Sequence, residues 1–191
     1  MKADKSIIDQ LLQRVKLLDS KSLLKPMSLQ ELHDSTCEFI EMVFKDTGSA
    51  PTLWVISNDT SILWIETDWH SGIEKSVITK VMAMFLEAVE ATAYSFISEA
   101  WVVNSEIFPA DQREELTKRA MEGGLENFPA EYRDDICMIS SFDASGEAMM
   151  TQYKVTITQR RNALNLLGPR MDIDTTPLKM EGRLWNLLKK T

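Results

Sequence analysis

The sequence predicts a single α+β domain with one five-stranded, mostly antiparallel sheet, N-terminal helices and a short C-terminal helix. Three observations support this fold class. Two runs rich in β-branched and aromatic residues flank a turn-forming cluster, apolar stripes with helical spacing stand on either side of them, and the length of 191 residues suits one domain. Apolar residues make up 44% and charged residues 26%, which is typical of a chain that buries a core.

Two N-terminal helices are expected, over residues 6–19 and 28–46. In the first, apolar residues recur at steps of three and four, which gives a stripe that must bury against the rest of the chain. The second opens at Ser28, which with Glu31 matches the capping box, in which each side chain binds the other residue's free backbone N–H group. We place both helices before the strands, within a domain that covers residues 1–158.

Residues 52–57 and 62–67 are expected to form a β-hairpin around the turn-forming residues 58–61. A four-residue loop places Val55 opposite Trp64. One face of the hairpin then carries Trp54, Ile56, Leu63 and Ile65, and the other carries Leu53, Val55, Ile62 and Trp64. Because a sheet with one solvated face would alternate apolar and polar residues, both of these faces need a cover. Helices on both sides, or a partner chain on one of them, would supply it.

The rest of the core follows in the order helix, strand, strand, strand. A helix is expected from Ser71 to Glu90, and a strand over 92–103 that is apolar on both sides and therefore central in the sheet. Strands over 135–142 and 147–158 surround a second turn, and the later one alternates as a half-exposed strand does. The core order is therefore β-β-α-β-β-β.

The C-terminal part, residues 159–191, is expected to be a basic extension that ends in a short helix. From Met150 onward there are 8 basic and 3 acidic residues, a net charge of +5, whereas the first 149 residues hold 13 basic and 26 acidic residues, a net charge of −13. The extension either docks on the acidic body or offers a contact surface for an anionic partner. The residues proposed for that surface are Arg160, Arg161, Arg170, Lys189 and Lys190.

The candidates for a catalytic site are a cluster of two carboxylates and a histidine, and one further carboxylate. Glu66, Asp68 and His70 follow the second hairpin strand closely and could act as general acid and base, although a polar strand end before a capped helix would give the same pattern. Glu99 lies in the middle of an otherwise apolar strand. If buried, this carboxylate would need a ligand or a partner, such as Arg133, Arg160 or Arg161; alternatively, Glu99 lies at an edge of the sheet.

Several site classes lack their motifs. There is no glycine-rich phosphate loop, no serine-hydrolase elbow and no zinc-ligand spacing, so we expect no cofactor and no metal. The two cysteines, Cys37 and Cys137, are expected to be buried thiols, and the acidic body disfavours nucleic acid. No apolar run reaches the length of a membrane span and no secretory signal is recognisable, so a soluble cytoplasmic protein is expected.

The excess of apolar sheet surface favours a non-enzymatic interaction or structural protein that forms a homodimer or binds another protein. The contact residues proposed for this surface are Leu53, Val55, Trp64, Trp69 and Trp101. The alternative is a small hydrolase or ligand-binding enzyme that uses the acidic and histidine cluster. The enzyme requires Glu66, Asp68, His70 and Glu99 to converge on one pocket.

Residues 98–101 (SEAW), 132–147 and 153–158 are similar to segments of a loose set of small bacterial and phage proteins that have no assigned function. The resemblance covers residues 94–158, implies a bacterial or phage cytoplasmic protein and assigns no catalytic residue. The order of elements also resembles the Roadblock or profilin-like arrangement, which commonly dimerises, and this analogy concerns the fold alone.

Overall fold

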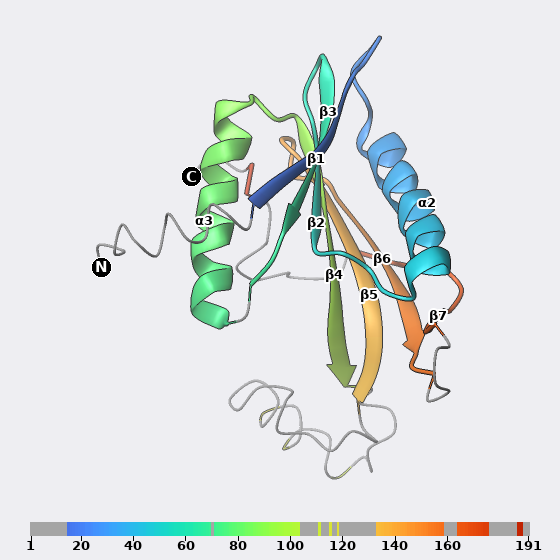
Figure 1. Cartoon of the computed structure of the whole chain (residues 1–191). Helices are drawn as coiled ribbons and strands as arrows, with labels where there is room; N and C mark the ends of the chain where they lie inside the picture. Colours follow the sequence, from blue (N-terminus) through green and yellow to red (C-terminus); the bar gives the residue numbers. More distant parts are fainter. Residues whose placement is uncertain are drawn as a thin grey trace.

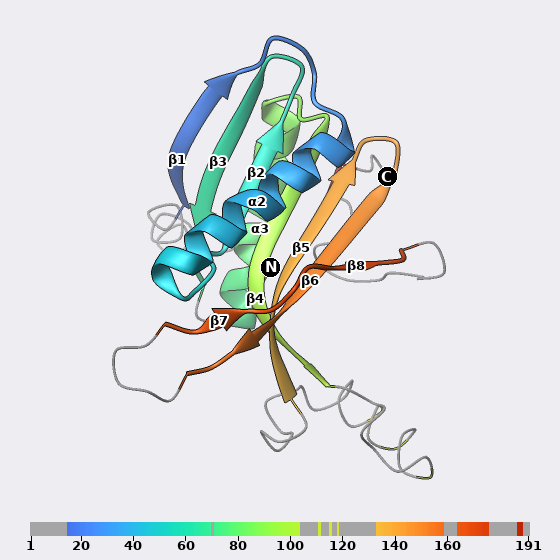
Figure 2. The same ribbon diagram turned by 90° about the vertical axis from the view of Figure 1, so that its right-hand side faces the viewer.

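The structure, a computed structural model, describes residues 15–69, 71–103, 133–158 and 164–175, together with the single positions 111, 115, 118, 187 and 188. Within these residues one sheet follows the order β1-β3-β2-β4-β5-β6-β7, with β8 also paired to β6, and it curls into a half-barrel (Figures 1 and 2). Its strands are β1 (Val15–Ser22), β2 (Leu53–Ser57), β3 (Ser61–Thr67), β4 (Ala93–Val103), β5 (Arg133–Asp143), β6 (Ala148–Thr156), β7 (Leu166–Leu167) and β8 (Met171–Ile173). Two helices, α2 (Leu29–Thr47) and α3 (Gly72–Ala88), are present in the described ranges.

The prediction of a five-stranded sheet with two N-terminal helices is wrong. Residues 15–19, expected to end the first helix, belong to β1, and residues 6–14 lie outside the described part of the chain. The physical reason is the open edge of the predicted hairpin, because β1 pairs antiparallel with β3 from Val15 opposite Thr67 to Ser22 opposite Ser61. Backbone pairing with a distant strand outweighs the local helical spacing of apolar residues.

The sheet also continues beyond residue 158, where an extension with a short helix was expected. β7 and β8 pair antiparallel with β6, so residues 166–173 close the edge opposite β1. Leu187 and Leu188 form a turn packed on the α3 side, where the Leu187 N–H donates to the Tyr94 hydroxyl at 3.1 Å. The remainder of the expected C-terminal helix lies outside the described residues.

The hairpin itself is as predicted. Val55 pairs with Trp64 and Ser57 with Ile62, and both faces are covered within the chain. On one face, the α2-side core packs Leu32, Ile40 and Phe44 of the helix against Leu53, Val55, Ile97 and Ile139 of the sheet. On the other face, the α3-side core packs Ile78, Met82 and Leu86 against Trp54, Ile56, Ile65, Tyr94 and Phe96. Figure 1 shows the two helices on opposite sides of the sheet, which removes the need for a partner chain over either face.

The predicted capping box at the start of α2 is confirmed. The Glu31 N–H donates to Ser28 Oγ at 3.2 Å, and the Ser28 N–H donates to Glu31 Oε2 at 2.9 Å. Hydrogen bonds from Lys25 and Ser28 lower the pKa of Glu31 to about 2, so its carboxylate is ionised wherever the protein is folded near neutral pH.

We expect Ser28→Ala to lower the free energy of unfolding by about 1 kcal/mol, because the first turn of α2 loses its side-chain acceptor. Equilibrium denaturation in urea measures the loss. Ser28→Asp keeps an acceptor at the same position and is the matched control, expected to stay close to wild type. Equal losses in both variants would show that the cap contributes nothing beyond the serine's own packing.

Candidate functional site

A pocket of about 380 Å³ opens on the α2 side of the sheet, at the end where β4 leaves and β5 returns. Its lining comes from β4, β5 and β6, from the residue after β6 and from the residue before β7: Glu99, Ala100, Asp135, Ile136, Val155, Ile157 and Asn165. The pocket lies there because β4 extends beyond the start of β2. β2 begins at Leu53, which pairs with Ile97, so the last residues of β4 have no β2 neighbour, and α2 has already ended at Thr47.

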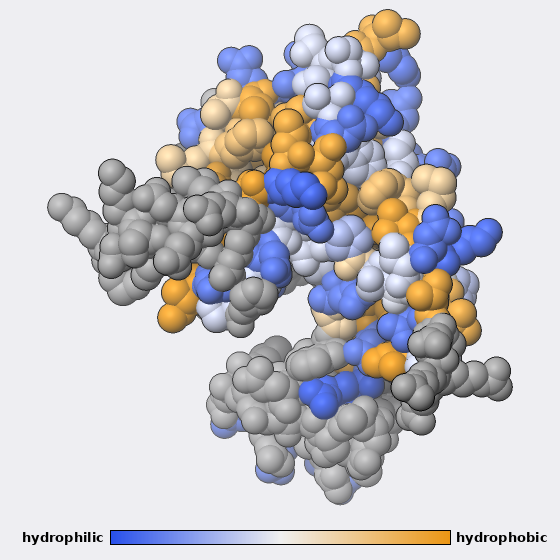
Figure 3. Space-filling model, in the orientation of Figure 1, coloured by the Kyte–Doolittle hydropathy of each residue, from blue (hydrophilic) through white to orange (hydrophobic). Residues whose placement is uncertain are grey.

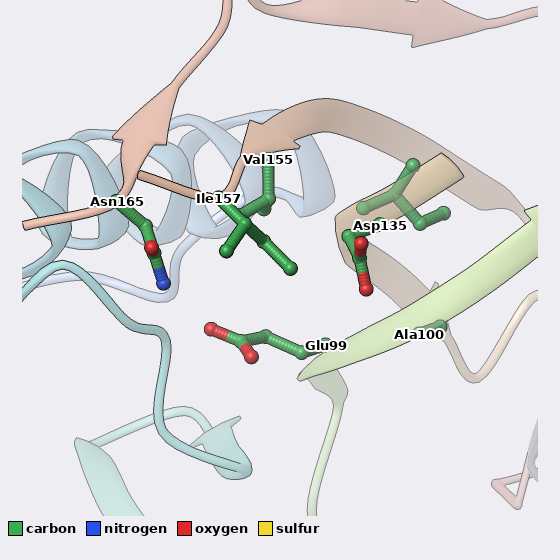
Figure 4. Close-up of a pocket in the computed structure, with 7 residues that line it drawn as sticks. Glu99, Ala100, Asp135, Val155, Ile157 and Asn165 are labelled. Carbon is green, nitrogen blue, oxygen red and sulfur yellow. The ribbon is translucent and has the colours of Figure 1, made fainter. Parts of the chain in front are cut away.

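Glu99 is exposed, which decides a question that the sequence left open. Its side chain lies on the α2 side but beyond the helix, where Oε1 accepts the backbone N–H of Ala50 at 2.8 Å. That bond fixes the carboxylate at the pocket instead of leaving it to rotate in solvent. Figure 4 shows Glu99 reaching into the pocket, with Asp135 on the neighbouring strand and Asn165 across from it.

The opposite wall of the pocket is apolar, formed by Val155 and Ile157. Asn165 closes the pocket beside them, held by its Oδ1, which accepts the Thr158 N–H at 3.1 Å. The chain passes very close to the end of α2 here. A Cβ on Gly48, whose φ is +71°, would lie 2.9 Å from the backbone nitrogen of Asn165, so both the backbone conformation and the space favour glycine.

Exposed apolar side chains surround this pocket on its β6–β7 side. Ile157 is 58% exposed, Leu164 46% and Leu166 62%. Figure 3 shows hydrophobic surface in orange where β7 lies in Figure 1. A group of exposed large apolar residues beside a pocket is a common feature of binding surfaces.

The predicted catalytic residues are not brought together. Glu66 pairs with Leu53 on β2, and β2 separates its strand from β4, which carries Glu99. Asp68 is exposed after the end of β3, and His70 lies outside the described residues. The pocket that Glu99 lines is therefore not lined by Glu66 or Asp68.

The aromatic and aliphatic residues predicted as partner contacts have different environments. Leu53 and Val55 are fully buried under α2, so a partner could reach them only if the helix moved away. Trp64 is half-buried against Phe39, with ring centroids 4.6 Å apart. Trp69 is half-buried and stacks on Phe96. Trp101 belongs to β4, and its side chain lies outside the described part of the structure.

Of the basic residues predicted for an anionic partner, Arg170 is engaged within the chain. It forms ion pairs of 2.8 Å with Asp34 of α2 and with Asp172 of β8. Of the two alternatives for the basic extension, Arg170 therefore follows docking on the chain's own acidic residues. Arg160, Arg161, Lys189 and Lys190 lie outside the described residues.

Sequence reasoning missed a buried polar chain between α2 and the sheet. His33 Nδ1 lies 2.7 Å from Ser141 Oγ, and Nε2 lies 2.8 Å from Thr151 Oγ1. Ser141 Oγ lies 2.7 Å from Ser95 Oγ, and Thr151 Oγ1 donates to Asp172 Oδ1 at 2.5 Å. Small hydroxyl residues at inward positions of three strands are the sequence signal that could have revealed it.

A serine next to an imidazole invites comparison with a hydrolase, but the geometry does not support one. His33 is 1% exposed, while Ser95, Ser141 and Thr151 are wholly buried, and the pocket described above does not include them. A nucleophile needs a site where a reacting atom can approach it. These residues instead fix the position of α2 on the sheet.

Comparison with protein-family models, with curated proteins and with solved structures finds no match to this chain. In the described ranges, no three His, Cys, Asp or Glu side chains are grouped closely enough to hold a metal ion. The same ranges contain no helix of the length and apolar character that a membrane crossing requires.

Proposed function

We propose that this chain is a non-enzymatic protein-binding module whose pocket receives a basic side chain of its partner. The observation that supports the proposal is the pocket itself. Two carboxylates, Glu99 and Asp135, come from neighbouring strands, and the apolar wall formed by Val155 and Ile157 stands opposite them. A lysine or arginine side chain has the matching character, an aliphatic stem that ends in a cation.

The apolar residues around the pocket extend the same surface. Leu164 and Leu166 are exposed beside Ile157, so residues that flank the basic side chain of the partner have apolar contacts available. The net charge of −8 favours the approach of a basic partner over distances of about one Debye length. The proposal includes a cytoplasmic setting, for which the buried, unpaired thiols of Cys37 and Cys137 are suitable.

A randomised peptide library displayed on yeast tests the proposal with the whole chain as bait. We expect the selected peptides to carry Lys or Arg beside apolar residues. A synthetic peptide from the selection should bind at least tenfold more weakly to the Glu99→Gln, Asp135→Asn double variant, a loss of about 1.4 kcal/mol. Replacing the basic residue of the peptide by norleucine should have a similar effect.

The matched control is the Glu38→Gln, Glu87→Gln double variant, which removes the same charge from exposed positions of α2 and α3. It should bind the peptide as the wild type does. Equal losses in the two double variants, or a library that yields no peptide, would contradict the proposal. If the wild type sediments as a dimer and the pocket variant as a monomer, the partner is a second copy of this chain.

A further inference from the structure

Residues 164–175 form a cover over one edge of the sheet, which we call the edge segment. β7 pairs with Val155 and Thr156, the Gly168 N–H donates to Lys154 O at 2.8 Å, and β8 pairs with residues 150–152. The edge segment thus occupies the outer edge of β6 along almost its whole length (Figure 2). Without this cover, β6 would present unpaired backbone groups to other chains.

Polar side chains hold the edge segment to α2. Arg170 bridges Asp34 of the helix and Asp172 of the segment, each at 2.8 Å. Asp172 also accepts the hydroxyl hydrogen of Thr151, which is in turn bonded to His33. Hydrogen bonds therefore connect the edge segment to the His33 ring through Thr151.

The direction of these bonds defines the state of His33. A carboxylate only accepts, so Thr151 donates its single hydrogen to Asp172 and must accept from His33 Nε2–H. The neutral ring then leaves Nδ1 to accept from Ser141, which accepts from Ser95. The neutral imidazole with its proton on Nε2 satisfies every member of this chain.

The charged groups that face His33 come from α2 and from the edge segment. Asp34 lies next to it on α2, and Arg170 and Asp172 lie on the segment, whereas β4 and β5 contribute the serines. Cys37 of α2, Cys137 of β5 and Tyr153 of β6 are nearby uncharged groups whose pKa values burial raises. Burial, together with the positive charge of Arg170, lowers the pKa of His33, although Asp172 and Asp34 act in the opposite direction.

We propose that the edge segment is a proton-sensitive cover, which opens from β6 when His33 takes up a proton. Lifting the segment removes Asp172 and Arg170 from the chain of bonds and uncovers Thr151, the residue next to the ring. Water can then reach His33, and a strand of another chain can pair with the free edge of β6.

Thermodynamic linkage sets the direction of the effect. The pKa of His33 is lowered in the closed state and returns toward its ordinary value of 6.5 when the ring is solvated. The closed state therefore has its full stability above about pH 6.5 and loses it as the pH falls from there toward the closed-state pKa. Within that window opening takes up at most one proton, so the opening equilibrium constant rises as the pH falls, by no more than about tenfold for each unit of pH.

Native-state amide exchange on the full chain tests the proposal without any partner. We expect the protection of Gly168 and the β8 amides, corrected for intrinsic exchange, to fall as the pH is lowered from about 6.5, with a slope of at most about tenfold per pH unit. Low concentrations of denaturant should barely change the protection of these edge-segment amides, because the opening exposes little surface. The protection of the β2 amides should instead fall steeply with denaturant.

Two variants make the outcome decisive. His33→Gln should abolish the pH dependence of the edge-segment amides. Arg170→Gln is the second variant if His33→Gln does not fold. It removes the repelling cation and brings the closed-state pKa of His33 nearer to 6.5, so the total pH-dependent loss of protection should be smaller than in the wild type. Because it also removes two ion pairs, protection should be lower than in the wild type at every pH. The proposal is overturned if the wild type and His33→Gln show the same pH slope, or if the edge-segment amides exchange with the steep denaturant dependence of β2.

Discussion

Trp54→Ala should lower the free energy of unfolding by roughly 3–5 kcal/mol, as large-to-small substitutions of buried aromatic residues do. Trp54 is fully buried on β2, where its ring packs 4.6 Å from Phe96 and 5.7 Å from Tyr94 between ring centroids. Its indole N–H donates to Thr67 Oγ1 at 3.1 Å, and alanine would leave that hydroxyl without this donor. The substitution therefore creates a cavity and removes a buried hydrogen bond in the α3-side core.

Equilibrium unfolding in urea, followed by circular dichroism, measures this loss. Met84→Ala is the matched control, because Met84 lies on α3 with its side chain 71% exposed and alanine favours a helix. We expect it to stay within about 0.5 kcal/mol of wild type. A loss below about 1.5 kcal/mol for Trp54→Ala would mean that α3 does not cover this face of the hairpin as described.

The hairpin could be predicted to the residue because its determinants are local. The turn-forming residues 58–61 set the loop length, and the loop length alone fixes Val55 opposite Trp64. The apolar residues on both faces of the hairpin predicted a cover on each face, and this prediction is confirmed. The choice between a partner chain and the chain's own helices could not be made from the pattern, since it depends on where α2 and α3 pack.

The outer strands could not be predicted because distant pairing decides them. Residues 15–18 have an apolar spacing that suits a helix, yet Leu17 and Leu18 are exposed and the segment pairs with β3. The edge segment, with Gly168 and Pro169 in its middle, lacks the alternation of a long strand. The edge segment forms strands only through its hydrogen bonds to β6 and its ion pairs to α2, which no local pattern encodes.

The candidate site was partly visible in the sequence. Glu99 stood out as a carboxylate within an apolar strand, and it does line the pocket. Its exposure depends on β2 beginning opposite Ile97, which the sequence does not show. The hydrogen bonds of His33 could not be predicted, because its partners Ser141 and Thr151 are 108 and 118 residues away in the chain.

Thr151→Val is the substitution that best isolates the buried polar chain, because valine keeps the shape of threonine and removes only its hydroxyl. His33 Nε2–H would then lose its acceptor in a fully buried position. An unsatisfied buried polar group costs about 1–3 kcal/mol, so we expect a loss of that size in the free energy of unfolding. Thr151→Ser keeps the hydroxyl and loses one methyl group, which costs about 0.8 kcal/mol.

The ring itself reports whether this explanation is right. In the wild type the nitrogen chemical shifts of His33 should show the neutral form protonated on Nε2, because Thr151 gives its hydrogen to Asp172. In Thr151→Val the proton should move to Nδ1, where Ser141 can accept it by reversing its hydroxyl. Thr151→Ser should keep the wild-type form. A wild-type ring already protonated on Nδ1 would mean that the chain of bonds runs in the other direction, and Asp172 would then not be coupled to His33 through Thr151.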